Sequence, residues 1–194
     1  MAAASRNMEV DSDRTPQDSE PELVPYGLVR RSTGTAKGHG VFATVSFNPG
    51  DLVIPGKVGR LVSANDTHPN QVGPNEWVIE DGFGPLVNHS CDPNCGIRLN
   101  DLDGYDFIAM RPIAIGEEVT WDYATRNYAI THFPSMCLCG MAACRGLVTG
   151  WKGLSEDRKT FYINAGFFAT YLLELDTGRR ACEEVTKATD LELA

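Results

Sequence analysis

The sequence predicts one domain of mostly β structure (β+α), made of small sheets and followed by a helix. Short runs of β-branched and aromatic residues recur through the middle of the chain, and Asn-Pro-Gly or Pro-Gly turn signals separate them. A helical pattern follows after residue 153. The 194 residues, of which 42% are hydrophobic, are enough for one buried core.

The two ends of the chain differ from its middle in composition. Residues 1–22 have almost no large apolar side chains, so we expect a disordered acidic tail there, and a flexible tail over 179–194. Acidic and basic residues number six and two in 1–22, fourteen and twelve in 23–173, and six and three in 174–194. The net charge of -9 therefore comes mostly from the ends, and the nearly neutral middle predicts no direct nucleic-acid partner.

The cellular compartment follows from what the sequence lacks. It contains no run of eighteen apolar residues, and residues 1–10 lack the apolar core of a secretion signal. We therefore expect an intracellular protein, in the nucleus or the cytoplasm, with no membrane partner.

Strands are expected where β-branched and aromatic residues cluster. These runs cover residues 28–30, 41–47, 51–54, 77–79 and 119–123. Apart from 77–79, residues 61–80 are rich in Asn, Asp, His, Pro and Gly, which predicts a loop, with His68 in solvent.

A single helix is expected over residues 153–178. Ser155 can cap its N-terminus, Gly166 weakens its interior and Gly178 ends it. An apolar face would dock on the core of the domain, so a monomer is favoured over a dimer through this face. That face consists of Phe161, Ala165, Phe168, Leu172 and Leu175.

The segment 37–43 has the sequence KGHGVFA, in which Gly38 and Gly40 match a G-x-G-x-x-A pattern. A dinucleotide-binding turn needs a helix to open at the glycines, whereas a strand-like run follows here. We therefore reject that interpretation. Two residues without Cβ atoms still let the backbone approach a ligand closely, although a simple turn between strands remains the alternative.

Three of the six cysteines, Cys137, Cys139 and Cys144, lie in a C-x-C-x4-C pattern. In a reducing compartment this spacing favours a metal site over disulfides, and structural zinc takes four ligands. The candidates for the fourth ligand are Cys91, Cys95 and Cys182. The alternative is that these cysteines serve as small core residues, and this is the preferred interpretation for Cys95 and Cys182.

Two further segments contain polar and aromatic residues that could form an active site. Residues 88–94 have the sequence NHSCDPN, and residues 116–123 have the sequence GEEVTWDY. By themselves, Asn88 and His89 could belong to an ordinary turn, and Tyr123 could be a core tyrosine. Taken in order with the glycine pair and the cysteines, however, these segments resemble the SET domain, a methyltransferase fold that acts on protein lysines. The resemblance covers roughly residues 26–150.

The resemblance implies a fold of small β-sheets with a knotted active-site crossing, a SET domain over 23–134, and a post-SET zinc-binding segment over 135–152. It implies S-adenosyl-L-methionine and zinc as cofactors, with Cys91 as the fourth zinc ligand. Tyr123 would be the catalytic tyrosine, and Trp121 would line the channel for the acceptor. The residues implied to contact the methyl donor are Lys37, Gly38, His39, Gly40, Asn88, His89 and Tyr123.

The methyl transfer explains why a tyrosine is useful. A lysine amine, with a pKa of about 10.4 in water, must arrive neutral and aligned with the methyl group. A phenol oxygen can orient that amine, while the sulfonium charge disfavours its protonated form. The implied substrate is a protein with an accessible lysine, such as a histone or another basic protein.

The chain departs from the family pattern at three places. Trp121 replaces the usual Phe or Tyr, residues 57–60 replace a segment with a second channel tyrosine, and Pro85 replaces a common arginine. These changes leave the number of transferred methyl groups open. They also leave two alternatives, a small-molecule amine as acceptor or a non-catalytic module that binds the cofactor.

Overall fold

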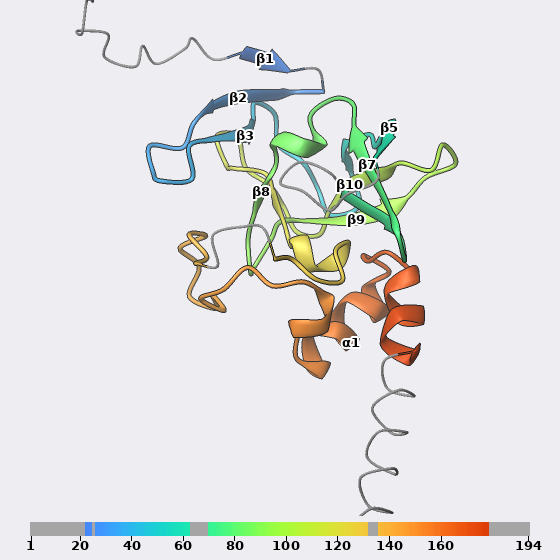
Figure 1. Cartoon of the computed structure of the whole chain (residues 1–194). Helices are drawn as coiled ribbons and strands as arrows, with labels where there is room; N and C mark the ends of the chain where they lie inside the picture. Colours follow the sequence, from blue (N-terminus) through green and yellow to red (C-terminus); the bar gives the residue numbers. More distant parts are fainter. Residues whose placement is uncertain (1–21, 25, 63–69, 132–135, 179–194) are drawn as a thin grey trace, which may run out of the picture.

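The computed structural model describes residues 22–24, 26–62, 70–131 and 136–178. Its N-terminal sheet contains β1 (Glu22–Val24), β2 (Leu28–Ser32) and β3 (His39–Ala43), in that order and antiparallel. In the view of Figure 1 this sheet lies at one end and the C-terminal helices lie at the other. The expected acidic tail falls outside the described residues except for Glu22, which begins β1, and the expected tail over 179–194 falls outside them entirely.

A second sheet forms the centre of the domain. It contains β4 (Leu52–Ile54), β10 (Tyr105–Ala109) and β9 (Cys95–Leu99), antiparallel and in the order β4-β10-β9. Val53, Ile97 and Phe107 point from it into the core and are at most 1% exposed. Cys95 is also buried in this core, as expected for a cysteine that is not a metal ligand.

A third sheet occupies the region where the sequence predicted a loop. It contains β5 (Val58–Val62), β7 (Glu76–Glu80) and β6 (Asn70–Gly73), in the order β5-β7-β6. The loop prediction was therefore wrong for β6 and for the last two residues of β5, 61–62. In β6, with the sequence NQVG, cross-strand pairing with β7 stabilises a segment with little β propensity of its own. His68 lies outside the described residues.

The fourth sheet is a short parallel crossing of β8 (Asn88–His89) and β11 (Thr120–Trp121), preceded by the 3-10 helix η1 (Gly84–Leu86). The buried side chain of Asn94 fixes this crossing, because it accepts a hydrogen bond from the Thr120 amide (2.8 Å) and donates one to the Glu118 carbonyl (2.8 Å). The expected strand over 119–123 is shorter than predicted. Asp122 ends it by capping a 3-10 helix, η2 (Tyr123–Thr125).

The C-terminal region contains two helices, not the single helix that the sequence predicted. After η3 (Trp151–Gly153), α1 (Glu156–Ala165) begins at the Ser155 cap and ends at Gly166, and residues 171–178 form the second helix. Gly166 has φ 68° and allows a left-handed C-cap, in which the Phe167 amide bonds back to the Tyr162 carbonyl (3.1 Å).

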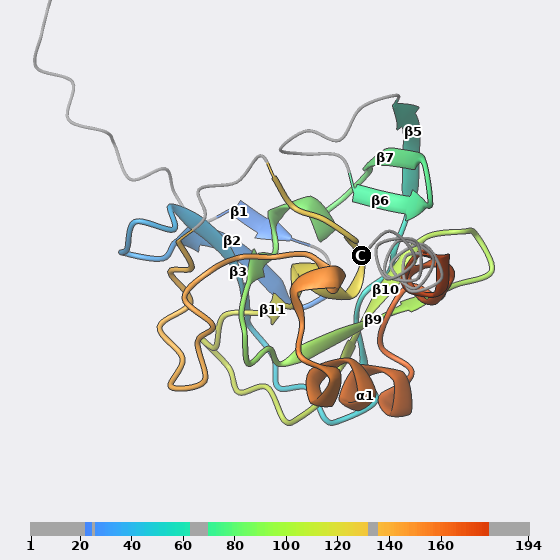
Figure 2. The same cartoon turned by 60° about the horizontal axis from the view of Figure 1, so that its bottom comes forward.

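This break changes which residues face the core. Phe161, expected on the buried face, is 45% exposed, whereas its neighbour Tyr162 is completely buried. Leu172 in the second helix is buried as predicted. The segment after α1 packs on the central sheet, because a Cβ added at Gly96 of β9 would lie 2.3 Å from the Phe167 side chain. In the view of Figure 2, α1 is drawn below β9.

The mostly β fold class is confirmed. None of the described helices is long and apolar enough to cross a membrane.

Candidate functional site

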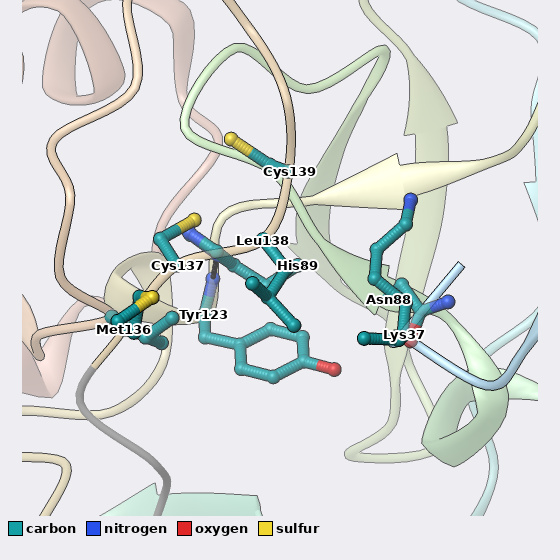
Figure 3. Close-up of a pocket in the computed structure, with 10 residues that line it drawn as sticks. Lys37, Asn88, His89, Tyr123, Met136, Cys137, Leu138 and Cys139 are labelled. Atoms are coloured by element: carbon teal, nitrogen blue, oxygen red, sulfur yellow. Dashed lines mark hydrogen bonds between the residues drawn. The ribbon is translucent and has the colours of Figure 1, made fainter.

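A cavity of about 240 Å³ opens where the crossing faces the cysteine-containing segment (Figure 3). The residues that line it come from the loop before β3, from the crossing and from the segment after residue 135. They are Ala36, Lys37, Asn88, His89, Tyr123, Met136, Cys137, Leu138, Cys139 and Val148. Four of the seven residues expected to contact a cofactor are in this set.

Tyr123 lies between two sides of the cavity lining (Figure 3). Its hydroxyl points toward the side of Asn88 and Lys37, while Met136 and Cys137 lie on the other side (Figure 3). The hydroxyl donates a hydrogen bond to the Val87 carbonyl (3.0 Å), and burial raises the pKa of Tyr123 above its usual range. The phenol therefore stays protonated at neutral pH.

Trp121 lies behind Tyr123 and does not line the cavity. It is 3% exposed and packs edge-on against Phe107, with ring centres 5.5 Å apart. Its indole N–H donates to the same Val87 carbonyl that accepts from Tyr123 (3.3 Å). The two residues singled out for catalysis thus share one acceptor, and the role of Trp121 in an acceptor channel stays a prediction.

His89 connects the cysteines to the backbone of Tyr123. Its Nδ1 accepts a hydrogen bond from the Tyr123 amide (3.3 Å), so Nε2 carries the ring proton and faces Cys91 Sγ at 3.4 Å. Burial lowers the pKa of His89 to about 4, although the nearby Asp122 carboxylate opposes this shift. The imidazole is therefore neutral at pH 7.

Glu118 is a residue of this site that the sequence analysis missed. It forms an ion pair with Lys37 and accepts a hydrogen bond from the Asn88 side chain (2.8 Å). The Asn88 amide also donates to the His39 carbonyl (2.9 Å). Glu118 thereby holds two cavity-lining side chains in place. Glu118 lies within the motif GEEVTWDY, and this position could have identified it as a site residue from the sequence.

The other predicted loop residues lie beside the cavity and not in its lining. Gly38 has φ 78°, a conformation that favours glycine. At Gly40 an added Cβ would lie 2.5 Å from Glu118 Oε1 and 2.9 Å from Asn88 Nδ2. The missing side chain therefore leaves room for the contact between Glu118 and Asn88, a role different from direct approach to a ligand.

The sulfur atoms of Cys91, Cys137, Cys139 and Cys144 all lie within 4.8 Å of one another. Four ligands at about 2.3 Å around a tetrahedral zinc ion would be roughly 3.8 Å apart, and the Cys91 and Cys137 sulfurs are 3.7 Å apart. The amides of Arg145 and Gly146 donate to the Cys91 and Cys144 sulfurs, each at 3.4 Å, which favours thiolates. This set, which we call the cysteine cluster, fits a structural zinc ion.

Asp122 was also missed, although it directly precedes Tyr123. Its side chain is completely buried and accepts two hydrogen bonds from the Arg145 guanidinium, at 2.7 and 2.8 Å. Tyr162 of α1 and the Ala124 amide donate to it as well, at 2.9 and 3.1 Å. The partners are up to 40 residues away, so spacing in the sequence gave no signal.

Part of the chain is similar to known proteins. The family model described as SET domain matches residues 38–124. Histone-lysine N-methyltransferase ATX2 of Arabidopsis thaliana is 34% identical over 143 residues, which cover 63% of this chain and 13% of that protein. Histone-lysine N-methyltransferase ATXR3 of the same plant is 40% identical over 94 residues, covering 40% of this chain and 4% of the relative. The chain thus spans only a small part of these relatives.

Solved structures show the same fold. KRYPTONITE, in complex with mCHG DNA and SAH, superposes with a TM-score of 0.54 at 20% identity, covering 66% of this chain and 30% of that one. SUVH6 of Arabidopsis thaliana, in complex with SAM, gives a TM-score of 0.53 at 21% identity, covering 64% and 33%. The matched region contains both strands of the crossing and Tyr123, so residues 38–124 of this chain are similar to the SET domain.

Proposed function

We propose that the chain transfers a methyl group from S-adenosyl-L-methionine to the side-chain amine of a lysine in a protein. The observation that carries this proposal is the cavity in which Tyr123, Asn88, His89 and Lys37 meet the cysteine-containing segment. The relatives named histone-lysine N-methyltransferases and the neighbours solved with SAM or SAH support the same cofactor and a histone as substrate. A histone substrate would place the action in the nucleus.

The bound cofactor would supply a methyl group on a sulfonium sulfur. The phenol oxygen of Tyr123 would accept a hydrogen bond from the lysine amine and orient its lone pair, and the Val87 carbonyl would hold the phenol in place. The new bond forms between nitrogen and the methyl carbon as the carbon–sulfur bond breaks, and the product amine then loses a proton. Met136, Leu138 and Val148 would provide apolar lining beside the reacting groups.

Zinc is the metal we propose for the cysteine cluster. Bound there, it would hold residues 137–144 next to Cys91 and so maintain one wall of the cavity. No proton or methyl group passes through the cluster in this scheme.

Methyl transfer from labelled S-adenosyl-L-methionine to purified histones and to cell-extract proteins tests the proposal. The wild type should label a protein band, and Tyr123→Phe should reduce that label by about 100-fold, within the range that one catalytic group contributes. Tyr26→Phe is the matched control, because Tyr26 is 59% exposed and lies outside the cavity. Label in small molecules alone would favour a metabolite amine, and cofactor binding without any transfer would favour a non-catalytic module.

A further inference from the structure

Asp122, Arg145 and Tyr162, which we call the Asp122 group, join three segments of the chain. Asp122 lies between β11 and η2, Arg145 directly follows Cys144, and Tyr162 belongs to α1. The Asp122 carboxylate accepts four hydrogen bonds from Arg145, Tyr162 and Ala124, and a carboxylate has about four acceptor positions. Its position is therefore fixed from all sides.

The Asp122 group is connected to the cavity through Tyr123. Asp122 caps η2, and Tyr123 is the first residue of that helix. A shift of the carboxylate would move this cap and, with it, the backbone from which the Tyr123 ring projects into the cavity.

The Asp122 group is connected to the cysteine cluster through Arg145. The backbone amide of Arg145 donates to Cys91 Sγ at 3.4 Å, while its side chain binds Asp122. Arg158 of α1 adds a second connection, since its guanidinium donates to the Cys91 carbonyl and lies 5.1 Å from the centre of the Tyr162 ring. Helix α1 therefore contacts Cys91 through Arg158 and Asp122 through Tyr162.

Tyr162 is suited to this position. The side chain is completely buried, and burial together with the Asp122 charge raises the pKa of its phenol above the usual range, so the hydroxyl remains a donor. Tyr162 does not line the cavity and lies outside the matched region 38–124.

We propose that Tyr162 is a positioning residue that fastens α1 to Asp122. This contact keeps the cysteine cluster and Tyr123 in a fixed position relative to each other. The inference rests on the proposed zinc site and methyl transfer. It makes the helix after the cysteine segment a functional part of the active site and not merely an attached element.

The test measures the rate at which zinc leaves the loaded full-length chain for a coloured chelator. Tyr162→Phe keeps the ring and removes the hydroxyl, and the loss of one hydrogen bond to a charged group should speed zinc release about tenfold. Arg145→Lys, which loses the paired contact with Asp122, should act in the same direction. The turnover number for methyl transfer should fall by a similar factor in both variants.

Tyr171→Phe is the matched control. Tyr171 is a similarly buried tyrosine whose hydroxyl binds the carbonyl groups of Gln71 and Arg126, away from Asp122. Its zinc release should stay within about twofold of the wild type, although its stability falls by a comparable amount. Equal zinc release in the wild type and Tyr162→Phe, equal acceleration in both Tyr variants, or failure of the chain to bind zinc would each overturn the inference. Because zinc release needs no methyl acceptor, selective acceleration without methyl transfer would reject the proposed function alone.

Discussion

The two walls of the cavity are built by different physical means. The crossing of β8 and β11 uses backbone hydrogen bonds and apolar burial, with Trp121 packed against the core behind it. In the opposite wall, residues 136–148, the structure describes no helix and no strand of two or more residues. The Leu138 and Met136 side chains of this wall are about half and two-thirds exposed. That wall depends on the cysteine cluster and the Asp122 group, so the two walls should respond differently to mutation.

Removing Asp122 should have the largest effect, because this residue serves both walls. Asp122→Ala leaves the largely buried Arg145 guanidinium without its partner and removes the acceptor for Tyr162, which should lower the free energy of unfolding by about 3–5 kcal/mol. Urea denaturation of the zinc-loaded chain measures this change. Asp101→Ala, in an exposed turn, is the control and should stay within about 0.5 kcal/mol. A loss below about 1 kcal/mol for Asp122→Ala would show that the two walls are independent.

A change behind the crossing should affect only that wall. Trp121→Phe leaves a gap in the core and removes the hydrogen bond to Val87, so the free energy of unfolding should fall by about 1–3 kcal/mol while zinc release stays unchanged. Thermal or urea unfolding, with the chelator assay alongside, measures both. The control is Trp77→Phe, since the buried Trp77 indole N–H has no hydrogen-bond partner among the described residues and its loss should cost less. Faster zinc release in Trp121→Phe would contradict the separation of the walls.

The smallest structural change should affect binding more than folding. In Gly40→Ala the new methyl group would collide with the flexible side chains of Glu118 and Asn88. Because Glu118 binds both Lys37 and Asn88, these two side chains at the edge of the cavity would be displaced. Affinity for S-adenosyl-L-methionine, measured by titration calorimetry, should fall about tenfold. Gly178→Ala, where nothing lies within 4 Å of the added carbon, should bind like the wild type. Unchanged affinity in Gly40→Ala would remove this edge from the proposed cofactor site.

The sequence predicted the parts of the site that depend on local motifs. Residues 88–94 and 116–123 indicated the crossing through their resemblance to the SET domain. The cysteine spacing indicated a metal-binding segment, and the same resemblance selected Cys91 as its partner. The sequence did not reveal β5 or β6, and in β6 pairing with β7 overrides weak strand propensity. Nor did it reveal the Asp122 group, because hydrogen bonds between residues 23 and 40 positions apart produce no periodic pattern. The prediction of a single helix was wrong. The apolar stripe over 161–175 suggested one continuous helix, whereas α1 ends at Gly166.

The most direct test of the proposed cofactor site is amide hydrogen exchange of the zinc-loaded chain with and without S-adenosylhomocysteine, the product of the proposed reaction. If the cavity is the cofactor site, protection should increase on both walls, in residues 36–40, 88–89 and 136–139, and should change little in residues 151–177. Increased protection confined to 151–177, or no change at saturating ligand, would contradict the assignment of the cavity between the crossing and the cysteine-containing wall.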